Sequence, residues 1–283
     1  MLPGTMDNVH LESGMLEIRH LTKIYDDGTV ALKDVSFTVQ DGEFLVIIGL
    51  SGSGKSTLLR CINRLIDPTE GKILWDGIDL AKLRGEELRK ARRQIGMVFQ
   101  HFNLVKRSTV MTNVMAGRLG YAPTRSSVFG KFSAADREKA NKSLVRLGIL
   151  DQAHKRASEL SGGQQQRVGI ARALMQDPKM ILADEPVASL DPVLAHSILM
   201  HLENLNKQDK ITVLCSLHYL DLVQRYSTRV IGLRSGEVVY EGSRADILKI
   251  TDEQFKEIYG EEAERIGVGG LEGSLNNPEG GAA

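Results

Sequence analysis

The sequence predicts an α/β protein whose largely parallel sheet is flanked by helices. Three observations lead to this prediction. Apolar segments of strand length alternate along the chain with segments of helical spacing, as they do in parallel sheets. The segment 43–48 is apolar almost throughout, which indicates a strand buried on both faces. A glycine-rich loop at residues 49–54 then separates that strand from a helix.

The N-terminal third of the chain contains several short β-rich segments. Residues 16–19 and 35–39 are two of them, and the second alternates as a half-buried strand does. The turn signal Asp-Asp-Gly at residues 26–28 lies between the two. The later elements expected here are a helix over 56–65, a strand over 72–77 that runs into an Asp-Gly turn, and a strand over 95–99.

From about residue 101 to residue 160 the chain changes character. The segment 103–155 is polar, rich in alanine and helix-forming, with a loop around 123–130. We therefore predict a helical insertion in the α/β core. Alternation returns after Gly162. The elements expected there are a helix to about 175, a strand over 180–183, a helix over 195–205 and strands over 211–216 and 229–234.

The two ends of the chain are predicted to lie outside the main domain, which we place at residues 15–246. Residues 1–14 contain acidic residues and no apolar core of the signal-peptide type, so we expect a flexible leader. The C-terminal part is residues 247–283. Within it, residues 251–266 can form a charged amphipathic helix capped by Thr251 or Asp252. Residues 267–283 are rich in Gly, Asn and Pro, which predicts disorder.

The bulk composition is that of an ordinary globular protein. The 36 Lys and Arg residues balance the 36 Asp and Glu residues, so net charge gives no reason to propose a nucleic-acid partner. No segment approaches the roughly 20 apolar residues that cross a bilayer. A function at a membrane would therefore need another component to hold the chain there. The two cysteines, Cys61 and Cys215, lack a CxxC partner and are predicted to be packed, reduced thiols.

The strongest chemical signal is the loop that follows segment 43–48. It fits the phosphate-binding pattern GxxxxGK[ST] in the required strand-loop-helix context, which disfavours a plain glycine-rich turn. Glycines let successive amides point toward phosphate oxygens, and the positive end of the next helix adds to the attraction. Lys55 would contact the β- and γ-phosphates, and Ser56 would offer a hydroxyl to Mg²⁺. The predicted binding residues are Gly49, Leu50, Ser51, Gly52, Ser53, Gly54, Lys55, Ser56 and Thr57.

Two adjacent carboxylates follow the apolar strand 180–183. Asp184 is placed to hold Mg²⁺ through water, and Glu185 to polarise an attacking water as a general base. If the strand persisted that far, the two side chains would point to opposite faces. A strand followed by Asp-Glu is by itself more typical of a solvated loop. Beside a phosphate-binding loop, the catalytic interpretation is favoured.

A second anion site is predicted at the start of the helix after residue 160. Ser161, Gly162, Gly163 and Gln164 lie there, and the amides at a helix start attract anions. In isolation, Ser-Gly-Gly can equally be a loop cap. The chain contains one phosphate-binding loop but two predicted anion sites. The second site would therefore serve the ATP held by another copy of the chain.

These motifs, in this order, resemble the ATP-binding subunits of ABC transporters. The resemblance covers about residues 16–242 and includes the phosphate loop, Gln100 after a strand, the helical insertion, the segment 160–164, Asp184-Glu185, Ser189-Leu190-Asp191 and His218. It implies a P-loop NTPase core of the ABC ATPase type. An antiparallel β subdomain and an inserted helical subdomain at about 101–160 would complete the fold.

The resemblance also implies roles for single residues around the nucleotide. Tyr25 would stack on adenine, a contact of roughly 1–3 kcal/mol by analogy with base stacking; the alternative is an ordinary tyrosine at a strand end. Gln100 would reach Mg²⁺ and the attacking water, and would link the site to the helical subdomain. His218 would hold the γ-phosphate and orient Glu185, although a lone histidine is usually structural. Lys55 completes the implied catalytic set.

A head-to-tail dimer with two ATP molecules between its subunits is implied as well. Ser161 and Gly163 would bind the γ-phosphate of the opposite subunit's ATP, and Asp191 would cross the dimer seam. ATP would then close the dimer because only the closed state makes both sets of contacts. Hydrolysis would remove the bridging phosphate and reopen it.

The transported substrate is indicated by weaker resemblances. A nucleotide-binding domain without a fused membrane domain resembles bacterial importers. Three stretches are similar to phosphonate-importer ATPases, namely residues 107–120, residues 187–192, and residues 215–218 with the following 225–226 and 229–236. They imply uptake of phosphonate or a related phosphorus oxyanion, with ATP and Mg²⁺ as cofactors. These residues do not contact the substrate and report only ancestry.

The implied partners are a second copy of the chain, transmembrane permease subunits and, indirectly, a periplasmic or lipid-anchored phosphonate-binding protein. The implied location is peripheral, on the cytoplasmic face of the cell membrane, with no nucleic acid bound. Two alternatives remain open. One is an ABC ATPase for another solute, such as an amino acid or metal chelate, or an exporter. The other is a soluble ABC ATPase acting on DNA or ribosomes, which usually has long coiled coils or two such domains per chain.

Overall fold

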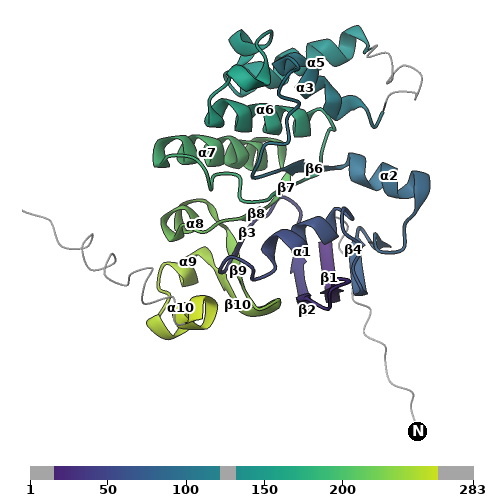
Figure 1. The fold of residues 1–283 in the computed structure, drawn as a ribbon. Helices are drawn as coiled ribbons and strands as arrows, with labels where there is room; N and C mark the ends of the chain where they lie inside the picture. Colours follow the sequence, from purple (N-terminus) through teal and green to yellow (C-terminus); the bar gives the residue numbers. More distant parts are fainter. Residues whose placement is uncertain (1–15, 122–131, 261–283) are drawn as a thin grey trace, which may run out of the picture.

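The computed structural model describes residues 16–121 and 132–260. The predicted leader 1–14, the loop expected around 123–130 and the tail beyond residue 260 lie outside the described residues. Figure 1 shows three parts: an antiparallel sheet at the lower right, a larger sheet with its helices in the middle, and a group of helices at the top.

The antiparallel sheet is built from the N-terminal third of the chain. Its strands are β1 (Leu16–Ile24), β2 (Val30–Val39), β4 (Glu70–Trp75) and β5 (Ile78–Asp79), in the order β2-β1-β4-β5. The predicted Asp-Gly turn joins β4 to β5, with Asp76 at φ 49 and Gly77 at φ 78. Two positive φ values are what a tight two-residue hairpin requires. The antiparallel β part that the resemblance implied is therefore present.

The larger sheet is parallel except at one edge. Its order is β10-β9-β3-β8-β7-β6, and only β10 runs antiparallel to its neighbour. The strands are β3 (Phe44–Ile48), β6 (Ile95–Val98), β7 (Met180–Ala183), β8 (Thr212–Ser216), β9 (Arg229–Arg234) and β10 (Glu237–Ser243). This arrangement confirms the predicted α/β fold class.

The central strand β3 divides the core into two halves. Phe44, Val46 and Ile48 pack in one cluster with residues of the later helices, and Leu45 and Ile47 pack in the other with α1 and the antiparallel sheet. All five side chains are buried, as the unbroken apolar run predicted. Burial of each contributes about 1.5–3 kcal/mol of hydrophobic free energy.

Helix α1 (Lys55–Ile62) lies between the two sheets and starts directly after the glycine loop. It is shorter than the predicted helix over 56–65. The chain leaves the helical conformation at Asn63, and Arg64 has a left-handed φ of 53.

The helices at the top of Figure 1 confirm a helical insertion. They are α3 (Val110–Met115), α5 (Ala134–Arg146) and α6 (Gly162–Leu174), with short 3-10 turns at η1 (Ala116–Arg118), η2 (Leu150–Gln152) and η3 (Ala157–Glu159). Helix α6 packs against α3 and α5 and also against α7 (Pro192–Asp209) of the central part. It therefore connects the helical group to the main sheet.

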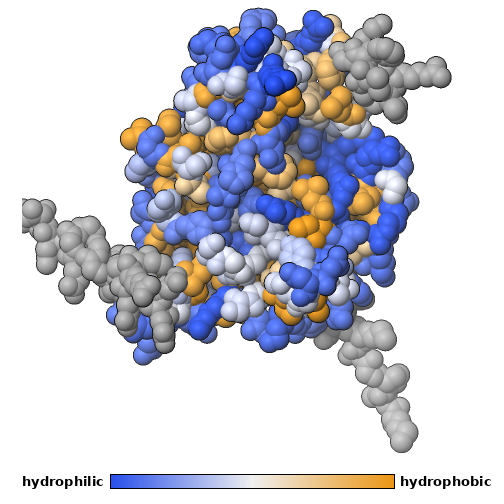
Figure 2. Space-filling view, viewed as in Figure 1, coloured by the Kyte–Doolittle hydropathy of each residue, from blue (hydrophilic) through white to orange (hydrophobic). Residues whose placement is uncertain are grey.

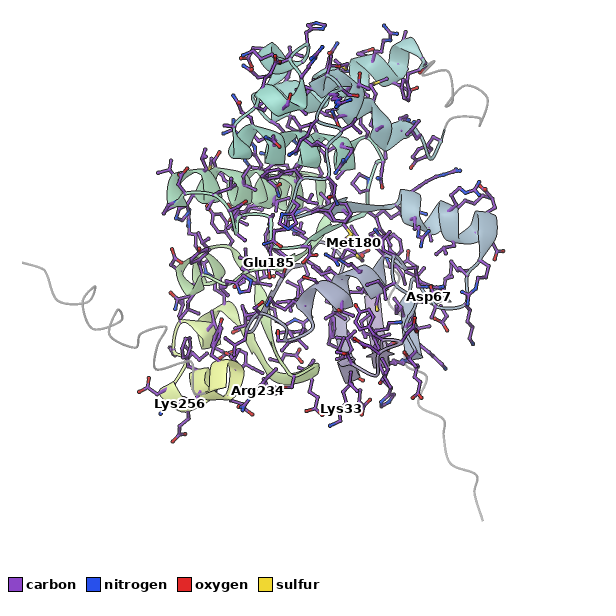
Figure 3. All side chains as sticks on the ribbon, in the orientation of Figure 1. Lys33, Asp67, Met180, Glu185, Arg234 and Lys256 are labelled. Atoms are coloured by element: carbon purple, nitrogen blue, oxygen red, sulfur yellow. The ribbon has the colours of Figure 1, made fainter. Side chains whose placement is uncertain are left out.

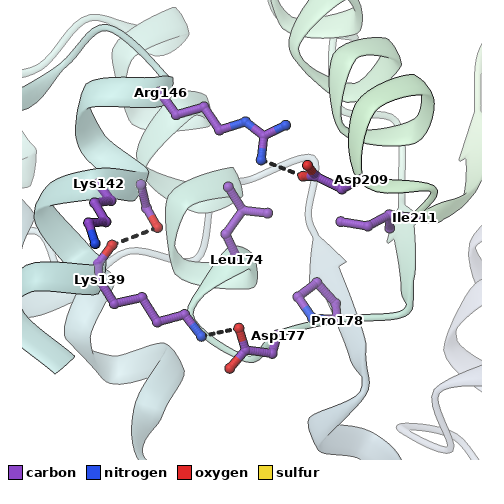
Figure 4. Close-up of a pocket in the computed structure, with 9 residues that line it drawn as sticks. Lys139, Lys142, Arg146, Leu174, Asp177, Pro178, Asp209 and Ile211 are labelled. Atoms are coloured by element: carbon purple, nitrogen blue, oxygen red, sulfur yellow. Dashed lines mark hydrogen bonds and ion pairs between the residues drawn. The ribbon is translucent and has the colours of Figure 1, made fainter. Parts of the chain in front are cut away.

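A cavity of about 400 Å³ lies at the seam between α5 and the central part. Ion pairs span it, from Arg146 to Asp209 at the end of α7 and from Lys139 to Asp177 (Figure 4). Arg118 also bonds Asp177, with 3.1 Å between the guanidinium nitrogen and the carboxylate oxygen. The seam is thus held partly by charge rather than by packed apolar side chains.

The C-terminal elements are α8 (Leu220–Tyr226), α9 (Arg244–Ile247) and α10 (Asp252–Tyr259). Thr251 caps α10, as one of the two predicted caps, and shares a capping box with Gln254. Helix α10 ends at Tyr259, and Gly260 after it adopts φ 60 and ψ −152. That backbone conformation is open essentially only to glycine. Residues 261–266 of the predicted helix lie outside the described residues.

The surface in Figure 2 is mostly hydrophilic, with small hydrophobic patches among polar residues. In the described parts of the chain, none of the helices combines the length and apolarity that a bilayer crossing requires.

Candidate active site

The loop after β3 has the geometry of a phosphate cradle. Gly49 has φ 141, and a Cβ added there would lie 2.1 Å from the carbonyl oxygen of Leu233. Gly54 has φ 107, and a Cβ there would lie 2.5 Å from the carbonyl oxygen of Ala31. Both positions therefore require glycine for backbone angle and for space. The loop is held against the sheet by β9 and β2 and delivers the chain into the N-terminus of α1.

Lys55 is the first residue of α1 and is buried, with 3% of its surface exposed. Its Nζ donates to the carbonyl oxygens of Gly49 and Leu50, each at 2.8 Å, and lies 3.9 Å from a carboxylate oxygen of Glu185. Burial lowers the pKa of Lys55, and the charges of Glu185 and Asp184 oppose this effect. The ammonium thus lies inside the loop, where a phosphate would bind.

Asp184 lies directly after β7 and is 2% exposed. Its Oδ1 accepts a 2.7 Å hydrogen bond from Ser56 Oγ, and its Oδ2 lies 3.2 Å from the guanidinium of Arg60. Two of the three residues predicted to hold Mg²⁺, Ser56 and Asp184, are therefore neighbours, although 128 positions separate them in the chain. Hydroxyl and carboxylate oxygens are the hard donors that Mg²⁺ prefers, so this pair fits the ion.

Glu185 has a left-handed backbone, with φ 48. Strand β7 ends two residues earlier, at Ala183, so the condition on which opposite-facing carboxylates were expected is not met and that expectation does not apply. The Glu185 amide donates to Ser216 Oγ at 2.8 Å, and its Oε1 lies 2.5 Å from His218 Nε2. Figure 3 shows Glu185 near the middle of the molecule.

The hydrogen bond with His218 holds the pKa of Glu185 below its usual range. Burial opposes this shift, and the charges of His218 and Lys55 reinforce it. A carboxylate that is ionised at neutral pH and lies beside a histidine can accept a proton from water.

Two further predicted residues flank this group. Gln100 is half-buried and lies two residues beyond β6, the sheet neighbour of β7. Phe102, just after it, accepts a 2.9 Å bond from Arg172 of α6 through its carbonyl, which ties this segment to the helical group. Tyr25 lies at the turn after β1, and its hydroxyl is 3.1 Å from Thr57 Oγ1 at the start of α1.

The predicted second anion site has a different set of neighbours. Ser161 caps α6 and forms a capping box with Gln164, in which each side chain bonds the other residue's amide. Glycines fill the positions between them, and a Cβ at Gly163 would lie 3.1 Å from the side chain of Leu194. Asp191 caps α7 by accepting from the amide of Leu194 at 3.0 Å. The segment 161–164 and Asp191 thus lie close together at the starts of α6 and α7.

The structure therefore divides the predicted residues into two groups. Residues 49–57, Gln100, Asp184, Glu185 and His218 gather at the carboxyl edge of the parallel strands. The segment 161–164 and Asp191 form the other group, on the α6 and α7 starts. Sequence reasoning missed two contacts within the first group: Arg60 and Ser216. Arg60 follows Ser56 by four positions, a helical spacing that places both on one face, whereas no sequence signal marks Ser216.

Comparison with known proteins agrees with this arrangement. The family model for ABC transporters matches residues 32–188. The phosphonates import ATP-binding protein PhnC of Shouchella clausii is 53% identical over 87% of this chain and 91% of that protein. The corresponding protein of Staphylococcus aureus (strain USA300) is 51% identical over 89% of this chain and 98% of its own length.

Solved structures give the same result. The dimeric structure of MJ0796, a bacterial ABC transporter cassette, superposes with a TM-score of 0.72 at 38% identity, covering 81% of this chain and 98% of that one. The ADP conformation of MJ1267, an ATP-binding cassette of an ABC transporter, gives a TM-score of 0.76 at 32% identity, covering 87% and 98%. This chain belongs to the ABC transporter family and is one of its ATP-hydrolysing subunits.

Proposed function

We propose that this chain energises the uptake of a phosphonate, or a related phosphorus oxyanion, through a separate permease. The observation that carries this proposal is identity of 50–53% across 91–98% of the length of relatives named as phosphonates import ATP-binding proteins. Similarity of that extent covers the whole ATPase and not merely its phosphate-binding loop. The three sequence stretches noted above point to the same substrate class.

In the proposed reaction, Lys55 and the amides of residues 49–54 bind the β- and γ-phosphates. Glu185 accepts a proton from the water that attacks the γ-phosphate, and His218 orients the Glu185 carboxylate through the bond to Oε1. Ser56 and Asp184, with Gln100 nearby, would hold Mg²⁺, which when bound neutralises phosphate charge. The close Ser56–Asp184 and Glu185–His218 pairs support these assignments.

The partners follow from the second group of residues. Ser161 and Gly163 would bind the γ-phosphate held by a second copy of the chain, in a head-to-tail dimer, and Asp191 would lie across the seam. The solved MJ0796 cassette is itself dimeric. Closure of this dimer would move the helical group and, with it, the permease helices. The chain would then work peripherally, on the cytoplasmic face of the membrane, with a phosphonate-binding protein on the other side.

Two experiments test the proposal at its two levels. Glu185→Gln should keep ATP binding, accumulate closed dimer and lose steady-state hydrolysis, because the amide cannot accept the proton; full turnover would remove Glu185 from the base role. The substrate is tested by co-purifying the permease, reconstituting it, and measuring ATPase stimulation by a binding protein loaded with phosphonate, phosphate or phosphite. If none of these three ligands stimulates hydrolysis while an amino acid or a metal chelate, tested in parallel, does, phosphonate uptake is refuted.

A further inference from the structure

Ser216 makes an unusual contact with the backbone of the proposed base. The parallel ladder of β7 and β8 ends with the pair Ala183 and Cys215. Beyond that pair, the left-handed turn at Glu185 takes its amide out of the ladder. Ser216 Oγ accepts the Glu185 amide at 2.8 Å and lies 3.5 Å from the carbonyl oxygen of Ala183, to which it donates. Its hydroxyl therefore bonds one backbone group on each side of Asp184, the carbonyl of Ala183 and the amide of Glu185, where the ladder no longer continues.

The Ser216 side of this contact is closed to water. Ser216 has no exposed surface, and Ala183, whose carbonyl it bonds, is also fully buried. An amide in such a place is normally paired, and a non-glycine residue with positive φ persists only where its surroundings hold it. For Glu185, Ser216 supplies one of these restraints.

We propose that Ser216 is a positioning residue for Glu185. It fixes the backbone, while His218, two residues later on the same segment, fixes the carboxylate through Oε1. The end of β8 thus holds the base at two points and sets its carboxylate between His218 and Lys55, whose Nζ lies 3.9 Å away. This inference rests on the proposed role of Glu185 as general base.

Ser216→Ala tests the inference. We expect kcat for ATP hydrolysis to fall about 10- to 100-fold, since small displacements of a catalytic group have effects of that order. KM for ATP should change little, because Ser216 is not among the phosphate contacts. Slower hydrolysis should also let the variant accumulate ATP-bound dimer during turnover, an effect that a general loss of folded protein does not produce. Wild-type kcat in Ser216→Ala would overturn the proposal.

Three controls separate positioning from stability. Ser227→Ala removes another buried hydroxyl, which lies away from this site and donates to the Val223 carbonyl oxygen over 2.7 Å. This variant should lower the melting temperature without lowering kcat. Ser216→Thr and Ser216→Val have the same shape and differ in the hydroxyl, so Thr should recover activity relative to Val. Equal kcat values for these two variants would also overturn the proposal.

The double variant Ser216→Ala with Glu185→Gln distinguishes failure of the positioning role of Ser216 from failure of the base role of Glu185. If Ser216 acts through Glu185, adding Ser216→Ala to Glu185→Gln should not slow residual single-turnover hydrolysis further. An additional loss of 10-fold or more would show that Ser216 acts elsewhere and would refute the positioning role. Full hydrolysis in the Glu185→Gln single variant would instead refute the base role itself.

Discussion

Ser161 allows a sharp test of the shared ATP site because the structure assigns it a local function as well. Its Oγ accepts the amide of Gln164 and caps α6, whereas the proposed dimer uses the same hydroxyl for the partner's γ-phosphate. Ser161→Ala removes both contacts. Ser161→Asp keeps a good cap, because aspartate caps helices as well as serine does, but places a negative charge where the phosphate must bind.

The two variants should therefore separate stability from ATP-driven dimerisation. Loss of the cap costs about 1 kcal/mol, or about 2–4 °C in melting temperature for a domain of this size, and only Ser161→Ala should show it. A hydrogen bond to a charged group contributes about 1.5–3 kcal/mol. With two such sites per dimer, closure of Ser161→Ala should weaken by about 3–6 kcal/mol, or about 100-fold to 10,000-fold. Ser161→Asp should weaken closure at least as much, because like charges repel.

The assay is ATP-dependent dimerisation in a Glu185→Gln background, followed by size-exclusion chromatography with light scattering. Thermal melting without nucleotide gives the cap contribution. Ser133 is a matched control, since it caps α5 in the same kind of capping box, and Ser133→Ala should lower the melting temperature while dimerisation persists. If Ser161→Asp dimerises with ATP as well as its parent, the hydroxyl does not bind the partner's phosphate and the shared-site reasoning fails.

Three further predictions follow from charges and burial. The pKa of Glu185 is held low, so its carboxylate stabilises the fold above the ordinary glutamate pKa of about 4.3, and this contribution disappears as pH falls through the lowered value. The part of the melting-temperature difference between wild type and Glu185→Gln that comes from the carboxylate charge should therefore be lost in acid, below about pH 4.3. Burial raises the pKa of Cys61 to about 12 and raises that of Cys215 as well, so neither thiol should react with iodoacetamide at pH 8 until the protein is unfolded. Asp209→Asn breaks the pair with Arg146, which is about one-third exposed on each side; it should cost less than about 1 kcal/mol at low salt and nothing measurable in 1 M NaCl.

The sequence predicted those parts of the fold whose pattern is strong and local. β7 and β9 have the predicted bounds, because each is a short apolar run between polar segments. Helix α2 (Gly85–Arg93) was not predicted, since it buries none of its side chains and has no apolar face to mark it. Strand β10 was not predicted either. Three of its seven residues are half-buried, two are buried and two are exposed, and a mixed pattern of this kind at a sheet edge gives only a weak alternation in the sequence.

Site residues were predictable as types but not as contacts. The motifs name Asp184 and Glu185, yet the left-handed backbone of Glu185 arises from where β7 ends and from its bond to Ser216. Arg60 reaches Asp184 across 124 positions. Such contacts depend on which strand lies beside which, and a single sequence does not specify that order.

Parallel topology explains why motifs far apart in the chain act together. β3, β8, β7 and β6 are successive neighbours and all run in one direction, so their carboxyl ends place the phosphate loop, His218, Glu185 and Gln100 along one edge. The segment 161–164 is not on that edge. Ser161 and Gln164 bond each other's amides in the capping box, and Gly163 is buried against Leu194 of α7. Ser161, by contrast, is exposed to solvent. A phosphate bound to it from a second chain would join two rigid groups that the fold of one chain keeps apart, and removal of that phosphate by hydrolysis would separate them again.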